Sequence, residues 1–208
     1  MAANPTSAAE AAQVRARLWD APVRLVHWSL VALIGFAWWT AETDRLQWHR
    51  WAGYAIIGLV AFRLLWGIWG SPNARFASFV KGPSASWSYL RTLGSRTPAD
   101  TPGHNPLGAW SGVALLAVLA FQVTTGLFAV DVDAFEAGPL SDRVSFETGR
   151  AISELHETGF AVLQLLVAAH IVAVFWYLLW KRSNLIGPML TGRRRLARDP
   201  GLTFAPWW

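Results

Sequence analysis

An apolar stretch over residues 156–180 decides the fold of this chain, and it reads HETGFAVLQLLVAAHIVAVFWYLLW. From Phe160 to Trp180 it contains no charged residue. A helix needs roughly 20 apolar residues to cross a bilayer core of about 30 Å, so this stretch is long enough to span a membrane. Two histidines, His156 and His170, lie on it 14 residues apart. On one helix that spacing is nearly four turns, so both imidazoles face the same side, about 21 Å apart along the axis.

Three further stretches have the length and apolarity of a membrane span. The four predicted spans, including the stretch described above, are Val23–Ala41, Trp48–Trp69, Leu107–Val130 and Phe160–Trp180. Hydrophobic residues make up 53% of the chain and charged residues 15%, whereas soluble domains contain about 25% charged residues. Trp, which concentrates at membrane–water interfaces, occurs 14 times. The sequence therefore predicts an all-α integral membrane protein, a four-helix bundle with short interfacial helices in its loops.

Basic and acidic residues gather in different loops of this predicted bundle. Lys and Arg are concentrated in the two terminal segments and the second loop, while the first and third loops hold most of the Asp and Glu. Because cytoplasmic loops carry the excess of Lys and Arg, both termini are predicted to be cytoplasmic. We expect a multi-pass protein of the bacterial inner membrane, embedded in the lipid bilayer, with its acidic third loop in the periplasm. The net charge of +5 reflects this topology and does not indicate nucleic-acid binding.

The spans form one predicted domain between two tails. We expect a mobile N-terminal tail over residues 1–18, a transmembrane domain over 19–195 and a C-terminal tail over 196–208. Asp20 is placed to cap the first helix, with Pro22 in its first turn. In the long second loop, Ser84–Leu93 has the pattern of a short helix in the headgroup region. The chain contains no Cys, which excludes Cys-ligated iron–sulfur clusters and haem attached covalently through C-x-x-C-H.

Four histidines match in depth across the predicted helices. The first helix runs outward from the cytoplasm, so His27 lies in the cytoplasmic half, and the second runs back, so His49 lies near the periplasm. The fourth helix also runs inward, which puts His156 at the level of His49 and His170 at the level of His27. Facing helices of a bundle build cofactor sites in this way. The sequence therefore predicts two haem b groups, with iron ligands His27 and His170 on the cytoplasmic side and His49 and His156 on the periplasmic side.

Other interpretations of these residues stay open. Histidine inside a membrane is a functional candidate because polar groups there are costly, but it can also serve as an interhelical hydrogen-bonding residue. A zinc site needs three or four ligands converging on one point, and the histidines form two distant pairs. Arg63 either extends its side chain towards the interface or pairs with a haem propionate. His104 and Asn105, at the cytoplasmic mouth of the third helix, either satisfy the helix end or bind a quinone carbonyl.

Several short motifs surround these residues in a fixed order. They are Trp19-Asp20-Ala21-Pro22-Val23-Arg24 followed by His27-Trp28; His49-Arg50-Trp51-Ala52-Gly53-Tyr54; Phe62-Arg63-Leu64-Leu65-Trp66-Gly67 followed by Gly70-Ser71; Ala74-Arg75-Phe76; His104-Asn105-Pro106-Leu107-Gly108; His156-Glu157 with His170; and Asn184-Leu185 through Thr191-Gly192-Arg193. In this combination the chain resembles the bacterial four-helix dihaem cytochrome b561 family. That family includes the membrane b-type cytochrome subunits of nickel–iron hydrogenases, and the gamma subunit of formate dehydrogenase-N has a similar design. The resemblance covers nearly everything from Trp19 to Arg195.

The resemblance implies bis-histidine haems on the first, second and fourth helices, with quinone bound near the cytoplasmic haem. It also implies a b-type cytochrome that transfers electrons between a periplasmic redox partner and the membrane quinone pool. The partner would be a c-type cytochrome or a hydrogenase or dehydrogenase subunit, and the acidic third loop offers a docking surface for a positively charged protein.

Two other functions remain as hypotheses. One is a stand-alone superoxide:quinone oxidoreductase, although the acids of the third loop would repel that anion. The other is a haem-free metal carrier or membrane anchor. Whether the chain is an enzyme by itself stays open, and we identify no catalytic residue.

Overall fold

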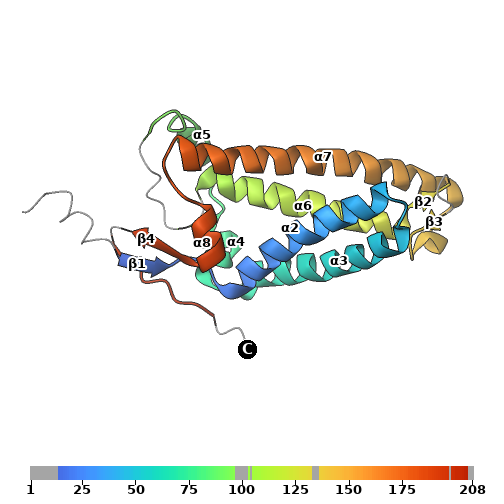
Figure 1. Cartoon of the computed structure of the whole chain (residues 1–208), viewed down its shortest axis with the longest axis horizontal. Helices are drawn as coiled ribbons and strands as arrows, with labels where there is room; N and C mark the ends of the chain where they lie inside the picture. The colour runs from blue at the N-terminus through green and yellow to red at the C-terminus, as the bar shows by residue number, and fades with distance from the viewer. Residues whose placement is uncertain (1–13, 97–102, 104, 133–135, 197, 206–208) are drawn as a thin grey trace, which may run out of the picture. The chain divides into compact units, whose positions relative to one another are not determined.

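The long helices of the chain are its main structural elements. The structure, a computed structural model, describes residues 14–96, 103, 105–132, 136–196 and 198–205. Within these residues four helices are long and apolar enough to cross a membrane. They are α2 (Ala21–Glu42), α3 (Leu46–Trp69), α6 (Pro106–Phe128) and α7 (Phe146–Leu179) (Figure 1). The four predicted spans and the all-α membrane fold are thereby confirmed. α7 begins at Phe146, within the predicted third loop and before the apolar stretch that starts at Phe160.

The ends of these helices follow from local sequence signals. Asp20 caps α2, since its Oδ1 accepts the backbone N–H of Val23 at 3.0 Å, as predicted. Asn105 caps α6 in the same way, accepting the N–H of Gly108 at 2.7 Å, and a proline follows it at the first helical position, where its missing N–H is harmless. Between α2 and α3 the chain turns within three residues, and Asp44 takes a positive φ of 55°, which Asp tolerates better than most residues.

The chain divides into two compact units. Unit 1 comprises Met1–Leu25, Leu65–Ala109 and Val172–Trp208, and unit 2 comprises Val26–Leu64 and Trp110–Ile171. Unit 2 is a four-helix bundle to which all four long helices contribute. Its core consists of the buried side chains of Ile56, Val60, Leu119 and Leu163, with partly buried residues such as Leu33 and Ala37 of α2 packed against them.

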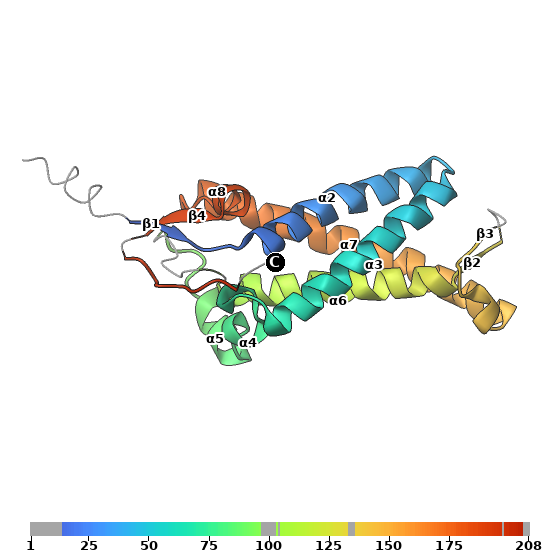
Figure 2. The same cartoon turned by 90° about the horizontal axis from the view of Figure 1, so that it is seen from below.

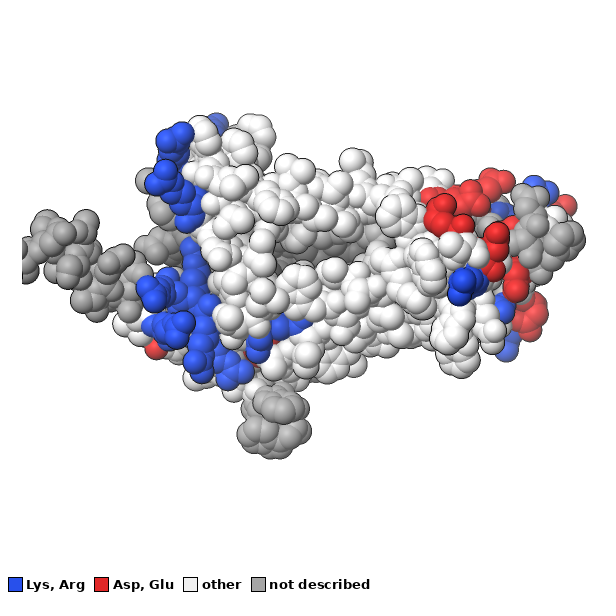
Figure 3. Space-filling model, in the orientation of Figure 1, with Lys and Arg blue, Asp and Glu red and all other residues white. Residues whose placement is uncertain are grey.

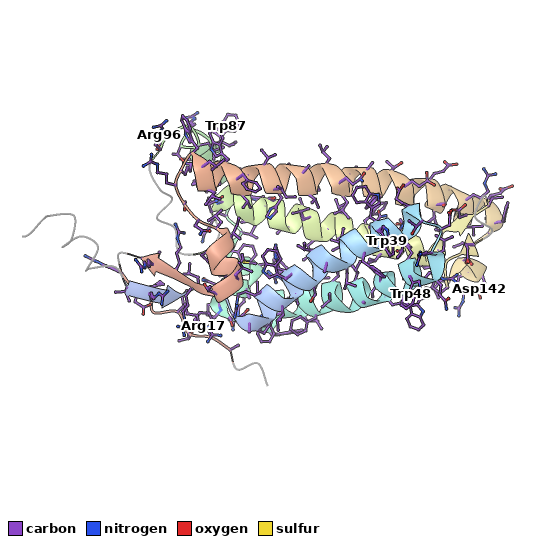
Figure 4. All side chains as sticks on the ribbon, in the orientation of Figure 1. Arg17, Trp39, Trp48, Trp87, Arg96 and Asp142 are labelled. Atoms are coloured by element: carbon purple, nitrogen blue, oxygen red, sulfur yellow. The ribbon has the colours of Figure 1, made fainter. Side chains whose placement is uncertain are left out.

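Outward-facing side chains of unit 2 are apolar as well. Leu165 of α7 is 69% exposed, which would be unfavourable in water but is expected of a residue that faces lipid. Trp39 of α2 and Trp48 of α3 are also largely exposed, and both lie near the turn that joins these helices (Figure 4). Exposed Trp near a helix turn is typical of the membrane–water interface.

Unit 1 contains short elements around the ends of the long helices. The short helices are α4 (Phe76–Phe79), α5 (Pro83–Leu90) and α8 (Ile186–Thr191), with the 3-10 turn η1 (Pro72–Ala74). α5 confirms the short helix expected in the second loop. The core of unit 1 is formed by Ala16, Leu18, Trp19, Val23, Ala74 and Leu196.

A two-stranded antiparallel ribbon in unit 1 was not anticipated. Its strands are β1 (Val14–Arg17) and β4 (Arg193–Leu196), and they lie side by side in both cartoon views (Figures 1 and 2). β1 falls within the stretch that we expected to be a tail, of which residues 1–13 lie outside the described part of the chain. The ribbon therefore joins the residues before the first span to those after the last.

A second ribbon belongs to unit 2. It pairs β2 (Val130–Asp131) with β3 (Glu136–Ala137), followed by the 3-10 turn η2 (Ser141–Arg143). Glu136 of β3 accepts a hydrogen bond from Arg50 of α3 at 2.6 Å, which ties the ribbon to the helix that carries His49. Asp and Glu side chains gather over this part of unit 2 (Figure 3).

Candidate functional site

All four predicted ligand histidines lie in unit 2. His27 is on α2, His49 is on α3, and His156 and His170 are on α7. Three long helices therefore carry the histidines, while α6 supplies side chains and backbone around them.

His49 and His156 face each other. Their ring centroids are 6.1 Å apart and the ring planes are inclined by 81°. Metal–imidazole bonds are about 2.0–2.1 Å long, so two nitrogens on opposite sides of one iron are roughly 4 Å apart and their ring centroids roughly 6 Å. The observed separation thus fits one iron held between these two rings.

Hydrogen bonds fix the orientation of both rings. Nδ1 of His49 lies 2.9 Å from the carbonyl oxygen of Ala37. Nδ1 of His156 lies 3.0 Å from the carbonyl oxygen of Gln122 and 3.1 Å from Oγ1 of Thr125. A carbonyl oxygen can only accept, so Nδ1 carries the proton in each ring. Nε2 is then left with its lone pair, which is the state in which histidine binds a metal, held by a hydrogen bond on its other nitrogen.

His27 and His170 are predicted to form the second pair. They are close enough to interact electrostatically. Nδ1 of His27 is buried and has no hydrogen-bond partner among the described residues. A buried polar atom without a partner is rare in native structures, so a bound group at this position would remove an unfavourable feature. The ring of His27 also meets the edge of Trp28, at a centroid separation of 5.0 Å.

Two glycines shape the space beside His49 and His156. A Cβ on Gly126 of α6 would lie 3.0 Å from Cε1 of His156, so glycine lets α6 approach this ring. Gly53 follows His49 by four residues and shares its helix face. A Cβ on Gly53 would meet nothing within 4 Å, which leaves room for a flat group beside the imidazole.

The donor set also limits which metal the chain can hold. In the described part of the chain, no group of three or more His, Cys, Asp or Glu residues is placed to hold a metal ion. Zinc sites require three or four protein ligands, whereas haem iron takes its equatorial ligands from the porphyrin and needs only axial ligands from the protein. Paired histidines therefore suit haem iron better than zinc.

Three further residues, Arg63, Asn105 and His104, were predicted to serve the haem or the quinone. Arg63 lies on α3 in unit 2, half-buried, 14 residues after His49. The same spacing separates His156 from His170 on α7. Asn105 uses its side-chain oxygen to cap α6, which leaves its amide N–H groups for another partner. His104 lies outside the described residues.

Sequence reasoning missed the groups that orient the rings. Two of them are backbone carbonyl oxygens, of Ala37 and Gln122, and these cannot be recognised from residue type. Thr125 carries a detectable signal, because it is a polar residue inside an apolar span, where such residues are costly and often functional. It also bonds to the backbone of its own helix, at the carbonyl oxygens of Phe121 and Gln122.

Comparison with protein families shows which family the chain belongs to. The family model for prokaryotic cytochrome b561 matches residues 18–192. The chain belongs to the prokaryotic cytochrome b561 family. As a cytochrome b561 it is a multi-pass bacterial membrane protein, a b-type cytochrome of electron transfer that binds haem b. No curated protein and no solved structure gave a significant match.

The motifs of this cytochrome b561 have structural roles besides the histidines. Asp20 accepts a hydrogen bond from the indole of Trp66 at 2.8 Å, linking the first motif to the third. Asn73 donates to the carbonyl oxygen of Leu18 at 3.0 Å, which fastens the second loop to the residues before α2. These motif residues therefore hold unit 1 together.

Proposed function

We propose that this cytochrome b561 binds two haem b groups and transfers electrons between a periplasmic redox partner and the quinone pool of the bacterial inner membrane. The observation that carries the proposal is the pairing of histidines, in which His49 and His156 have the separation of two axial ligands of one iron. Bound haem supplies reversible one-electron chemistry at iron. The chain's own residues determine where that chemistry occurs and which environment surrounds it.

The periplasmic-side site is held by His49 and His156. Their Nδ1 protons are bound by carbonyl oxygens of α2 and α6, so neither ring can turn without losing a hydrogen bond. Such outer partners fix the ring orientation and increase the basicity of the ligand. If both histidines bound the iron, they would leave no position for small molecules, which would favour electron transfer.

The cytoplasmic-side site is assigned to His27 and His170. α3 and α7 run in the same direction through the bundle, so Arg63, 14 residues after His49, lies at about the depth of His170. A guanidinium at this level is suited to bind a propionate carboxylate in bidentate fashion. We therefore assign Arg63 to the haem held by His27 and His170.

Quinone is expected near the cytoplasmic-side haem, with His104 and Asn105 as candidates for binding it. The periplasmic partner is expected to be basic. The described residues of unit 2 contain eight Asp and Glu and five Lys and Arg, and the acids gather around β2, β3 and η2 (Figure 3). A surface of this sign attracts a positively charged redox protein, such as a c-type cytochrome or a hydrogenase or dehydrogenase subunit.

Pigment spectra of histidine variants test the proposal. The purified wild-type protein should contain two irons per chain and give a b-type reduced-minus-oxidised spectrum. His27→Ala and His49→Ala should each retain one haem, and the two retained haems should differ in midpoint potential, since they are different sites. His104→Ala, which removes a histidine outside both pairs, should retain both haems. A colourless protein, or two variants that lose the same haem, would overturn the assignment.

A further inference from the structure

The β1–β4 ribbon of unit 1 presents four arginines on one face. Its register places Arg15 opposite Arg195 and Arg17 opposite Arg193. Side chains alternate between the two faces of a strand, so these four lie on the same face, and all four are exposed. The other face carries Ala16 and Leu196, which are buried in the core of unit 1.

This arrangement is unfavourable without a counter-ion. Directly opposed side chains of an antiparallel pair have their Cβ atoms about 4.5–5.5 Å apart, and like charges there destabilise the pairing. A two-stranded ribbon is marginally stable even without repulsion. Two pairs of opposed arginines therefore destabilise the ribbon when no anion is bound. Their presence indicates that an anion binds on this face.

No carboxylate among the described residues of unit 1 pairs with these arginines. Among the described residues of unit 1, Asp20 and Asp199 are the only acids, against thirteen Lys and Arg. Asp20 is buried and bonded to Val23 and Trp66, and Asp199 accepts the backbone N–H of Gly201. Two ion pairs among the described residues, Arg50–Glu136 and Arg143–Asp142, involve none of the four arginines. Basic side chains gather over β1, β4 and α8 (Figure 3).

The position of the ribbon favours an anion at the membrane surface. β1 ends four residues before α2 begins, a distance of at most about 14 Å. The N–H groups of Leu18 and Trp19 both donate to the carbonyl oxygen of Gly192 at 2.8 and 3.2 Å, which holds β4 against the start of the span. In the same unit, Leu179 is 75% exposed. A unit that carries both exposed apolar side chains and a basic face is suited to acyl chains and anionic headgroups together.

We propose that the four-arginine face of the β1–β4 ribbon binds the phosphate of an anionic phospholipid in the cytoplasmic leaflet. The planar guanidinium fork matches phosphate oxygens in bidentate geometry. Arg17 lies over the ring of Phe204, with its guanidinium carbon 4.3 Å from the ring centroid, and this stacking leaves the N–H edge of the guanidinium available. Both strands lie outside residues 18–192 that the family model matches, so the site is a property of this chain and is additional to its haem sites.

Lipid titration of the purified full-length protein tests the site. Phosphatidylglycerol is added in detergent, and the bound lipids are counted by native mass spectrometry. We expect it to bind the wild-type protein and to bind the Arg193→Gln/Arg195→Gln variant roughly 30-fold more weakly. The reason is that each arginine near an anionic headgroup contributes about fivefold in affinity. The matched control is Arg143→Gln/Arg150→Gln, which removes the same charge from unit 2 and should leave the affinity unchanged. Equal losses in the two double variants, or no loss in the first, would overturn the proposal.

Hydrogen exchange gives a second and independent measurement. In nanodiscs of phosphatidylcholine alone, removing the repulsion in Arg193→Gln/Arg195→Gln should slow exchange of the backbone amides of residues 14–17. Adding phosphatidylglycerol should slow their exchange in the wild-type protein and have little effect in the variant. Inorganic phosphate is added to the wild-type protein in phosphatidylcholine nanodiscs as a comparison. If it slowed the exchange of these amides to the same extent, free phosphate would be the ligand and the assignment to lipid would be overturned. An unchanged haem spectrum in each variant shows that the bundle remains folded.

Discussion

The contact between Gly126 and His156 sets how α6 packs against a predicted iron ligand. A Cβ at position 126 would lie 3.0 Å from Cε1 of the ring and 3.4 Å from Nδ1, so Gly126→Ala has to displace the imidazole by a few tenths of an ångström. Disturbing the groups that orient a ligand histidine costs about 10–100-fold in metal affinity. We expect Gly126→Ala to retain the periplasmic-side haem about tenfold less tightly, as measured by haem titration monitored by absorption.

Gly112 provides the matched control for this substitution. It lies on the same helix, and a Cβ there would meet nothing within 4 Å, so Gly112→Ala should bind both haems as the wild-type protein does. If Gly126→Ala also bound both haems with unchanged affinity, either the contact would not position His156 or His156 would not be a ligand. The His156→Ala variant separates these two outcomes, because it removes that side chain directly.

At the scale of single residues, the sequence predicted which side chains could bind iron, and it could not predict what holds them. Histidine inside an apolar span is unusual enough to be recognised by type and spacing, as for His156 and His170. The groups that fix Nδ1 of His49 and His156 include the carbonyl oxygens of Ala37 and Gln122. Every residue has such an oxygen, so only the packing of α2, α3, α6 and α7 in unit 2 identifies them.

Among the elements, the start of α2 is joined to the end of α3 by one buried carboxylate. Asp20 is 3% exposed, and it both caps α2 and accepts the indole N–H of Trp66. Losing an N-cap costs about 0.5–2 kcal/mol, and leaving a buried donor unsatisfied costs about 1–3 kcal/mol. We expect Asp20→Ala to lower the free energy of unfolding by about 2 kcal/mol, measured by thermal or denaturant unfolding of the purified protein.

Asp20→Asn separates the shape of this side chain from its charge. Asn is as good an N-cap as Asp, but its single oxygen replaces only one of the two carboxylate oxygens that accept from Val23 and Trp66. Asp20→Asn should therefore lose less stability than Asp20→Ala. Asp142→Ala, at a side chain that is 76% exposed, is the control for removing a carboxylate and should change stability by less than 0.5 kcal/mol or so. Equal stability of all three variants would show that Asp20 does not link the two helices.

The elements that the sequence predicted are those with a strong local signal. Spans are recognised by their length and apolarity, and α5 by its position in a loop rich in aromatic and small residues. The β1–β4 ribbon has no such signal, because its strands are four residues long, rich in Arg, and paired across almost the whole length of the chain. Pairing at that separation depends on the long helices bringing the two segments together, which no local pattern reveals.

For the molecule as a whole, the separation of charge determines orientation. The described residues of unit 1 are strongly basic, and those of unit 2 carry more acids than bases. Positive segments remain in the cytoplasm during insertion, so the terminal segments are predicted to be cytoplasmic and the acidic third loop periplasmic. This orientation would give the transfer of electrons between a periplasmic partner and quinone a fixed direction relative to the bilayer.

Electron transfer in that orientation should charge the membrane. When a membrane-impermeant reductant supplies electrons on the periplasmic side and quinone takes up protons on the side of the termini, negative charge moves inward. We therefore expect quinone reduction in oriented proteoliposomes to produce a potential that is negative on the side of the termini, reported by a voltage-sensitive dye. His49→Ala, which lacks one iron ligand, should produce none, and Asp142→Ala should behave as the wild-type protein. Quinone reduction without a potential would place the quinone site on the periplasmic side, because electrons and protons would then not be separated across the bilayer.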